Sequence, residues 1–299
     1  MRGEQNLNFN PTRRSLLLAG ASAAALAHFE RAFAKSLPTP DASGRLQALE
    51  SLHGGRLGVS ILDTGTGKRI GHRADERFPM CSTFKFLAAA QVLSRVDRGE
   101  ERLDRRIVYA KDDLVAYSPV TEKHVATGMT LAELCRATIT VSDNTAGNLL
   151  LASFGGPAGL TRFAQSLGDS VTRLDRWETE LNEAVPGDPR DTTSPAAMLD
   201  DMRSLLLGDT LSPASRKQLT DWLIATTTGD KRIRGGLPKE WRAGDKTGTS
   251  NNGVTNDIAI VWPPGRAPLL VAAYYAEYAQ PKEARNAVIA EVGRIAASL

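Results

Sequence analysis

Ser82 and Lys85 lie three positions apart at the start of an apolar run, in the segment Phe78–Leu93. Residues at this spacing share one face of a helix, so the hydroxyl and the amine could meet. A serine is a weak nucleophile until a base removes its proton, and a lysine can be that base only if its pKa is lowered by desolvation or by a nearby cation. Alone the pair is weak evidence, because Ser82 could simply cap the helix.

Two triplets further along the chain strengthen the case for a catalytic site. Ser142, Asp143 and Asn144 stand where a helical stretch breaks, and the two Asx side chains could cap the next helix. Lys246, Thr247 and Gly248 lie on a late predicted strand, whose edge could pair with a substrate amide. The glycine would admit a second backbone or mark a bulge. Lys246 beside Ser142 would hold an anionic group and lower the pKa of neighbouring amines.

These three motifs, in this order, resemble those of the serine penicillin-recognising enzymes, which include class A β-lactamases and penicillin-binding proteins. Glu178 and Asn182 decide between the two classes. They show the Glu-x-x-x-Asn spacing that class A β-lactamases carry on their omega loop and that penicillin-binding proteins lack. The sequence is therefore identified as a member of the class A β-lactamase family, and the resemblance covers nearly all of the chain after residue 34.

The resemblance implies catalytic roles for Ser82, Lys85, Ser142 and Glu178, with Asn182 as a binding residue beside them. Ser82 would be the acylated nucleophile and Lys85 its proton partner, while Ser142 would relay a proton to the departing lactam nitrogen. Glu178 and Asn182 would hold the hydrolytic water. Whether Lys85 or Glu178, acting through a water, is the base of the acylation step stays open.

The resemblance also implies how the substrate is held. Lys246 and Thr247 would bind its carboxylate, and Asn144 would bind its side-chain amide. The backbone N–H groups of Ser82 and Thr249 would form an oxyanion hole, where one donor contributes about 10²–10³ in rate. No cofactor is needed for this chemistry.

Three further features have counterparts in the family. Tyr117 resembles the aromatic residue at the cleft entrance, although a core or surface tyrosine is the alternative. Gly248 belongs to the substrate-binding strand. Arg176 and Asp191 match the pair that joins the two ends of the omega loop, and bidentate arginine–aspartate geometry suits such a link.

Some positions depart from the family pattern. Many members have a proline after the loop glutamate, in a cis peptide, where this chain has Thr179. Many also have an arginine on the strand that follows the Lys-Thr-Gly strand, at the position that matches Thr255. Arg232 matches an alternative site for that arginine, so we expect it to help bind the substrate carboxylate. The alternative is a surface arginine.

The two cysteines also depart from the family. Cys135 has Ala89 at the position of its usual family partner, and Cys81 has Ser250 at the position of the partner found in many carbapenem-hydrolysing members. We therefore expect no disulfide, and the pattern argues against strong carbapenem hydrolysis.

The elements that must position these residues follow from apolar periodicity and turn signals. Strands at both ends of the chain with helices between them predict a two-lobed α/β (α+β) fold. In it, an antiparallel sheet from both chain ends is flanked by terminal helices, and an all-helical lobe is inserted. We expect the active site between the lobes. The expected ranges are helix 41–52, hairpin 56–73, helices within 82–223, strands 241–246, 256–262 and 269–275, helix 281–298, an α/β lobe of 38–75 plus 225–299, and a helical lobe of 76–224.

The first 34 residues read as an export signal. Arg13 and Arg14 precede a short apolar stretch, and a small-x-small pattern ends at Ala34. Paired arginines favour the twin-arginine route over a Sec signal and predict a periplasmic protein. The stretch is too short and alanine-rich for a good membrane span, and no cysteine follows it, so we expect no membrane anchor.

The net charge and the histidine spacing argue against a nucleic-acid-binding protein and against a metalloenzyme. The formal net charge is +3, and the first 34 residues hold four arginines against two glutamates, which leaves about +1 for the rest. This low remaining charge and the lack of a basic stripe argue against nucleic-acid binding. The four histidines show no metal-ligand spacing, so no metal is expected. We expect a monomer acting on a small-molecule β-lactam, with a D-alanyl-D-alanine carboxypeptidase and a non-catalytic β-lactam sensor as alternatives.

Overall fold

A five-stranded antiparallel sheet is the frame of the protein in the computed structural model, which describes residues 41–299. The predicted signal of residues 1–34 lies outside the described residues. The first two strands are joined by a hairpin, as predicted, and β1 pairs along its whole length with the last strand of the chain. In spatial order the strands are β2 (Arg69–His72), β1 (Arg56–Asp63), β9 (Leu269–Ala276), β8 (Val254–Trp262) and β7 (Arg242–Ser250).

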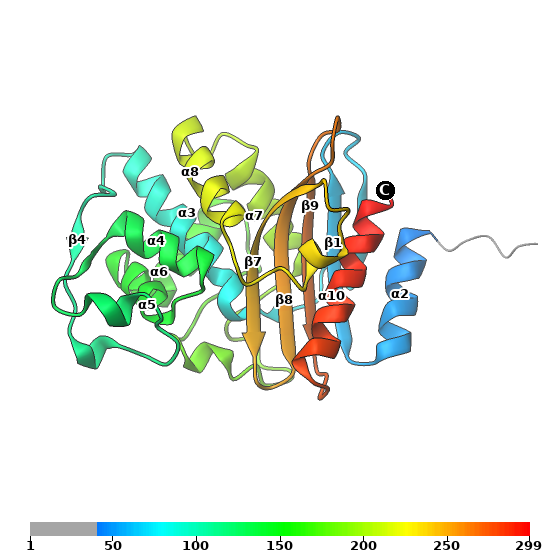
Figure 1. The fold of residues 1–299 in the computed structure, drawn as a ribbon, viewed down its shortest axis with the longest axis horizontal. Coiled ribbons are helices and arrows are strands. Elements are labelled where there is room, and N and C mark those ends of the chain that lie inside the picture. The colour runs from blue at the N-terminus through cyan, green and yellow to red at the C-terminus, as the bar shows by residue number, and fades with distance from the viewer. Residues whose placement is uncertain (1–40) are drawn as a thin grey trace, which may run out of the picture. The chain divides into compact units, whose positions relative to one another are not determined.

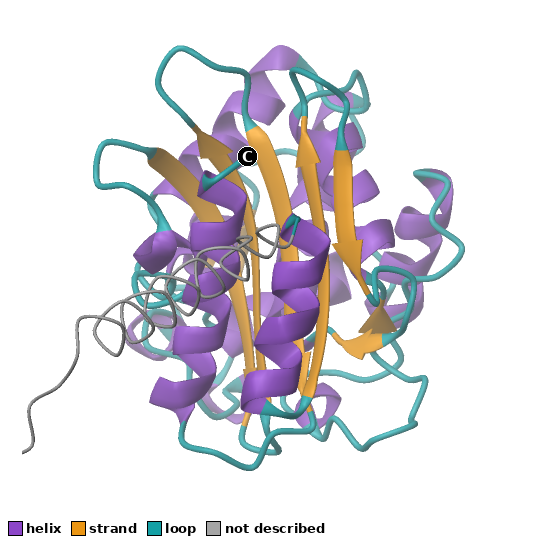
Figure 2. Ribbon diagram, turned by 90° about the vertical axis from the view of Figure 1, so that its right-hand side faces the viewer, coloured by secondary structure: helices purple, strands orange, loops and turns teal. Residues whose placement is uncertain are grey.

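Two terminal helices cover one face of this sheet. Figure 2 shows them side by side in front of the strands, and Figure 1 labels them α2 (Ala42–His53) and α10 (Lys282–Ala297). Apolar side chains of β1 such as Val59 pack with apolar side chains of α10 such as Val292 in one buried cluster. The strands are buried on both faces because other helices cover the opposite side.

The middle of the chain is mainly helical and surrounds α3 (Phe84–Asp97). Ten of the 14 residues of α3 are buried, as expected of a helix that is apolar on every side. The other helices here are α4 (Leu131–Thr140), α5 (Asn144–Ser153), α6 (Gly156–Ser166), α7 (Pro195–Leu206), α8 (Pro213–Ile224) and α9 (Ile233–Gly236). The short elements are strands β3 (Phe78–Pro79), β4 (Arg106–Ile107), β5 (Met129–Thr130) and β6 (Thr192–Thr193), and 3₁₀ turns η1 (Cys81–Thr83), η2 (Lys111–Asp113), η3 (Thr121–His124) and η4 (Glu180–Asn182).

The predicted fold class is confirmed, but two boundaries beside the motifs were wrong. The strand expected to end at Lys246 continues to Ser250, because its pairing with β8 runs on without a bulge through Gly248 opposite Asn256. The helix expected to begin at Ser82 begins at Phe84 instead, after the η1 turn. In the first case strand pairing overrides the turn propensity of the segment after Lys246. In the second case Ser82 lies in a turn, and the helix begins two residues after it.

Candidate active site

Ser82 lies in the η1 turn, directly before α3, where β7 passes close to it. The preceding residue, Cys81, has φ +45°, a conformation that is uncommon for a residue other than glycine and often marks a functional constraint. A Cβ atom at Gly248 of β7 would stand 2.6 Å from the Met80 carbonyl oxygen. The glycine therefore permits the close backbone approach expected from the sequence, and β7 has no bulge at this position.

The Lys85 amine is fully buried beneath Ser82 and contacts five oxygen atoms of other residues, one of them the Ser142 hydroxyl at 3.4 Å. It donates to Ser82 Oγ at 3.1 Å, to Asn144 Oδ1 at 2.6 Å and to the Ser142 carbonyl at 2.9 Å, and it lies 2.9 Å from Glu178 Oε1. Burial lowers the pKa of Lys85 from its ordinary value, although the Glu178 carboxylate opposes that shift. Lys85 therefore meets the condition required of a lysine base.

Glu178 approaches Ser82 from the loop that follows α6. Its Oε1 accepts the Ser82 hydroxyl at 3.2 Å, and its Oε2 accepts the Asn182 amide at 2.5 Å. The side chain of Asn148 on α5 exchanges two 3.0 Å hydrogen bonds with the Glu178 backbone, and the peptide between Glu178 and Thr179 is cis. The Glu178 backbone is thus held by Asn148 and its carboxylate by Asn182, and the carboxylate points at the serine.

Ser142 stands between two buried amines. Its hydroxyl accepts from Lys246 Nζ at 3.0 Å and from Lys85 Nζ at 3.4 Å, and its backbone has φ +63°. Burial, followed by the nearby charges of Lys85 and Arg232, holds the pKa of Lys246 well below its ordinary value. The hydroxyl can therefore exchange a proton with either amine.

Asp143 and Asn144, the other two members of this triplet, have different roles: one caps a helix and the other contacts the site. Asp143 is fully buried and caps α5, since it accepts the backbone N–H of Ala146 at 2.9 Å. It also accepts the backbone N–H of Thr121, in η3, at 3.0 Å. Asn144 instead points at Lys85 and donates its amide to the Ala116 carbonyl at 2.8 Å. The capping interpretation holds for the aspartate alone.

The buried Arg232 side chain is hydrogen-bonded to the end of β7 that borders the cleft. It is 3% exposed and donates to the Gly248 carbonyl at 2.8 Å and to Thr249 Oγ1 at 2.6 Å, while its Nε donates to Asn286 at 3.0 Å. Burial lowers the pKa of Arg232. Thr255 is fully buried on β8 and does not line the cavity, which Arg232 does. The alternative of a surface arginine is therefore wrong.

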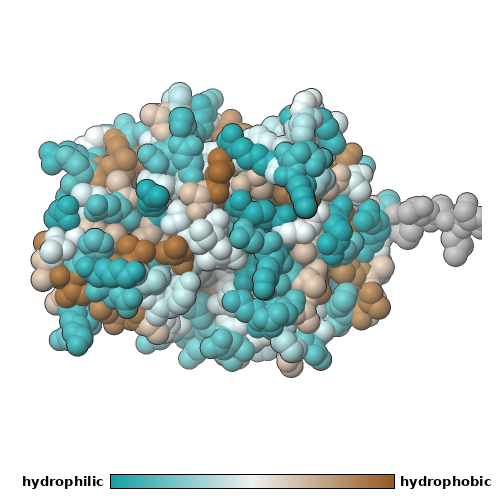
Figure 3. Space-filling model, viewed as in Figure 1, coloured by the Kyte–Doolittle hydropathy of each residue, from teal (hydrophilic) through white to brown (hydrophobic). Residues whose placement is uncertain are grey.

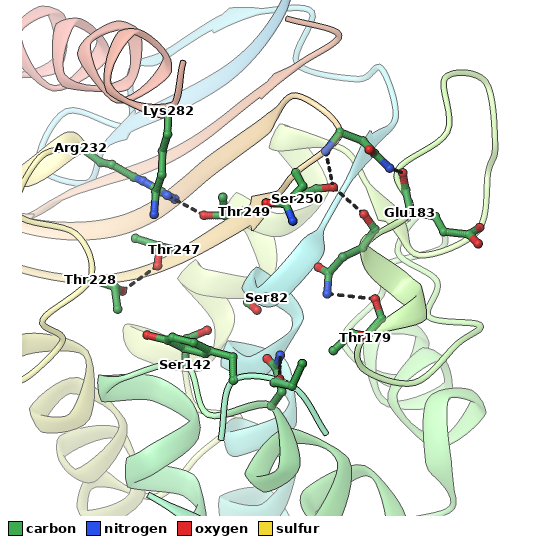
Figure 4. Close-up of a pocket in the computed structure, with 16 residues that line it drawn as sticks. Ser82, Ser142, Thr179, Glu183, Thr228, Arg232, Thr247, Thr249, Ser250 and Lys282 are labelled. Carbon is green, nitrogen blue, oxygen red and sulfur yellow. Dashed lines mark hydrogen bonds between the residues drawn. The ribbon is translucent and has the colours of Figure 1, made fainter. Parts of the chain in front are cut away.

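A cleft of about 740 Å³ opens over these groups (Figure 4). Tyr117 stands at its rim with 60% of its surface exposed, so a core position is excluded. Four predicted site residues are not part of the lining and lie behind it: Lys85, Glu178, Lys246 and Gly248. The predicted site residues that line the cleft are Ser82, Tyr117, Ser142, Asn144, Asn182, Arg232, Thr247 and Thr249.

Arg176 and Asp191 lie outside the cleft and join the two ends of the segment that carries Glu178. Arg176 Nε donates to Asp191 Oδ2 at 2.6 Å, and the backbone N–H groups of Asp175 and Arg176 donate to Asp191 Oδ1 at 2.8 and 2.9 Å. The Asp191 carbonyl also accepts the Met80 N–H at 2.9 Å, next to the η1 turn. The ends of the loop are thereby tied to the turn that holds the serine.

Known proteins similar to this chain are β-lactamases. A model of the beta-lactamase enzyme family matches residues 41–298. The chain belongs to this family. It is 53% identical over 254 residues to beta-lactamase AST-1 of Nocardia asteroides, covering 85% of this chain and 82% of that protein. It is 50% identical to beta-lactamase L2 of Stenotrophomonas maltophilia, covering 95% and 97%.

Solved structures narrow the family to class A. An ancestral (GNCA) class A β-lactamase superposes with a TM-score of 0.84 at 68% identity, covering 85% of this chain and 98% of that one. A putative class A β-lactamase, PenP from Rhodopseudomonas palustris, gives 0.85 at 63% identity, covering 86% and 98%. The chain is thus a serine β-lactamase of class A, a hydrolase that acts on β-lactams.

Sequence reasoning missed two supporting residues of this β-lactamase. Asn148 lies four residues after Asn144, so helical spacing on α5 could have revealed that both face the site. Gly147 carries no such signal: a Cβ atom there would stand 3.0 Å from Lys85 Cε, so the glycine makes room for the lysine stem. Among residues 41–299, no group of histidine, cysteine and acidic side chains could hold a metal ion.

The two cysteines of this β-lactamase, Cys81 and Cys135, are both free and buried. Ser250, at the family position of a partner for Cys81, instead donates its hydroxyl to the Asn182 carbonyl at 2.5 Å. It also accepts the Asn252 N–H at 3.1 Å. The end of β7 is thus hydrogen-bonded to the Glu178 loop.

Proposed function

We propose that this β-lactamase hydrolyses the amide of penicillins and cephalosporins through an ester on Ser82. One observation carries the proposal: the Ser82 hydroxyl faces the cleft within hydrogen-bond distance of both the Lys85 amine and the Glu178 carboxylate. One nucleophile therefore has two proton acceptors that reach it from different elements.

In the acylation step, Ser82 Oγ bonds to the lactam carbonyl carbon and the C–N bond breaks. The serine proton passes to Lys85, or through a water to Glu178, and Ser142 delivers a proton to the departing nitrogen. The position of Ser142 between two amines supports this relay, because either amine can return a proton to it. The backbone N–H groups of Ser82 and Thr249 would stabilise the oxyanion.

In the deacylation step, a water attacks the ester carbonyl while Glu178 takes its proton. The ester C–O bond breaks, and Ser82 Oγ takes back a proton. Asn182 and Glu178 would hold this water, which is supported by the hydrogen bond between them and by the position of Asn182 in the cleft lining. The Arg176–Asp191 ion pair would keep the omega loop, residues 176–191, in this position.

The substrate would be oriented by groups along the cleft. Lys246, Thr247 and Arg232 would bind its carboxylate, since buried cations beside a hydroxyl favour an anion. Asn144 would bind the side-chain amide, and Tyr117 would cover the substrate at the rim.

The two alternative functions predict a different lifetime for the acyl ester on Ser82. A D-alanyl-D-alanine carboxypeptidase or a β-lactam sensor would keep the acyl ester for a long time, whereas Glu178 and Asn182 beside Ser82 favour rapid hydrolysis. The test is steady-state hydrolysis of a penicillin together with intact mass spectrometry. Wild type should turn over with only a transient adduct, and Ser82→Ala should form none. A wild-type adduct that outlasts substrate consumption would refute the proposal.

We further propose that residues 1–34 are a twin-arginine signal peptide and that residues 35–299 act as one monomeric catalytic domain in the periplasm. Within it, residues 38–75 and 225–299 would form the α/β lobe and residues 76–224 the helical lobe. The paired arginines and the apolar stretch after them support the export route. In the part of the chain that the structure describes, no helix is long and apolar enough to cross a membrane.

A further inference from the structure

Lys282 carries a charge at one end of the cleft that neither the motifs nor the proposed mechanism uses. It is the first residue of α10, it is exposed, and it lines the same cavity as Arg232 and Thr249. Figure 4 shows its side chain reaching from the helix toward the part of the cavity where Arg232, Thr247 and Thr249 lie.

The position of Lys282 does not serve the helix. The first turn of a helix favours negative charge, because the unpaired backbone N–H groups there are partially positive. Residues that break a local rule of this kind often serve function. Among residues 41–299 no carboxylate lies within ion-pair distance of the Lys282 amine, so it is not held by a structural salt bridge either.

The other charged groups of the lining are already engaged. Glu183 pairs with Arg176 on the omega loop, and Arg232 donates to the Gly248 carbonyl and to Thr249. Among the charged side chains of the described lining, Lys282 alone has neither a hydrogen bond nor an ion pair to another residue. Figure 3 shows a largely hydrophilic surface over β7, α9 and α10, the region from which this lysine projects.

We propose that Lys282 is a specificity-determining residue that favours β-lactams with a second negative charge beside the ring carboxylate. The inference rests on the proposed function, in which Lys246, Thr247 and Arg232 bind that carboxylate. In a cephalosporin, the C3 substituent is bonded to the carbon next to the one that bears the carboxylate. An anionic C3 substituent would therefore extend toward Lys282 and be attracted, and a cationic one would be repelled.

Three cephalosporins with the same thienylacetyl side chain test the proposal. Their C3 groups are a carboxylate-bearing thiomethyl, a neutral acetoxymethyl and a cationic pyridiniomethyl group. In Lys282→Met, which keeps the apolar stem, the ratio of kcat/KM for the anionic to the cationic compound should fall about three- to tenfold, as expected for one exposed charge. Lys282→Glu should lower it further, and Lys282→Arg should restore it. Added salt should reduce the wild-type ratio more than that of Lys282→Met.

The controls separate this inference from the proposed function. Lys68→Met removes an exposed lysine in the turn between β1 and β2, outside the cleft lining, and should leave the ratio unchanged. If wild type hydrolyses the neutral compound but Lys282→Met and Lys282→Glu keep the wild-type ratio, the role of Lys282 is refuted and the β-lactamase proposal stands. If wild type hydrolyses none of the three, the cephalosporinase part of the proposed function fails, and the role of Lys282 fails with it.

Discussion

The Lys85 amine lies 2.9 Å from a carboxylate oxygen of Glu178, and both side chains are closed off from solvent. The Ser82 hydroxyl lies within 3.2 Å of each. Removing one partner of a buried ion pair leaves the other charge uncompensated, which typically costs about 3–5 kcal/mol of stability. Substitutions at either position should therefore be compared with variants that keep the shape of the side chain.

Loss of the Glu178 carboxylate should stall the enzyme after acylation. Glu178→Gln keeps the shape and Glu178→Ala removes it, and both lack the base that the deacylating water needs. A general base contributes typically about 10²–10⁴ in rate, so deacylation should slow by that factor. Intact mass spectrometry after a pulse of penicillin should show an adduct on Ser82 that lasts far longer than in wild type. A Glu178→Gln protein that still turns over rapidly would overturn the assignment.

Loss of the Arg232 side chain should weaken transition-state binding of penicillins by about 1.5–3 kcal/mol, the range for a hydrogen bond to a charged group. The measurement is kcat/KM for Arg232→Ala, with thermal unfolding to check the loss of its bonds to Gly248 and Asn256. Thr255→Val is the matched comparison on the next strand and should have a smaller effect. Equal effects from the two variants would contradict the role of Arg232 in binding the carboxylate.

The buried carboxyl of Asp201 on α7 should make the protein less stable as pH rises. Burial, aided by the nearby Asp169 carboxylate, raises the pKa of Asp201 to about 9. The unfolded chain loses this proton near pH 3.9. Between these two pH values the folded state holds more protons, so the unfolding free energy falls as pH increases, by at most about 1.4 kcal/mol per unit.

Denaturant unfolding between pH 5 and 9 would check this expectation. Asp201→Asn cannot ionise and should flatten the decline. Asp200→Asn, at the neighbouring exposed position that pairs with Arg69, should change the slope far less, because Asp200 is the smallest of the contributions to the Asp201 pKa. Parallel curves for wild type and Asp201→Asn would show that Asp201 is ionised in the folded protein.

Both cysteines should be reactive only after unfolding. Cys81 and Cys135 are fully buried, and burial raises the pKa of each thiol, so little thiolate is available in the native state. A thiol reagent without reductant should add no label to the native protein and two labels to the denatured one. A mass two hydrogens lower with no labelling would instead indicate a disulfide.

Replacing Arg13 and Arg14 together with lysine should keep the precursor in the cytoplasm. The twin-arginine route depends on this pair, and the short apolar stretch after it is a poor signal for other routes. Cell fractionation with a penicillin hydrolysis assay would measure the exported fraction. Full periplasmic activity in the double variant would exclude the twin-arginine route.

The sequence by itself determined the family and the fold class. Ser82, the Ser142 triplet and the Lys246 triplet carry chemistry that requires these residue types, and Glu178 with Asn182 selects the class. Local signals also predicted the strands at both chain ends, because alternation and turn residues act over a few positions. The length of β7 beyond Lys246 could not be predicted this way, since it depends on pairing with β8.

Only the tertiary structure decided how the predicted residues meet. The hydrogen bond between Lys246 and Ser142 joins residues 104 positions apart, and that between Ser82 and Glu178 joins residues 96 apart. Contacts at such separations depend on packing, which no local pattern encodes. The same reason applies to the space that Gly147 leaves for Lys85, and to the burial of Arg232, whose place at the site the family resemblance had already predicted. Residue type thus specified the reaction, and long-range packing specified which of these groups are hydrogen-bonded to one another.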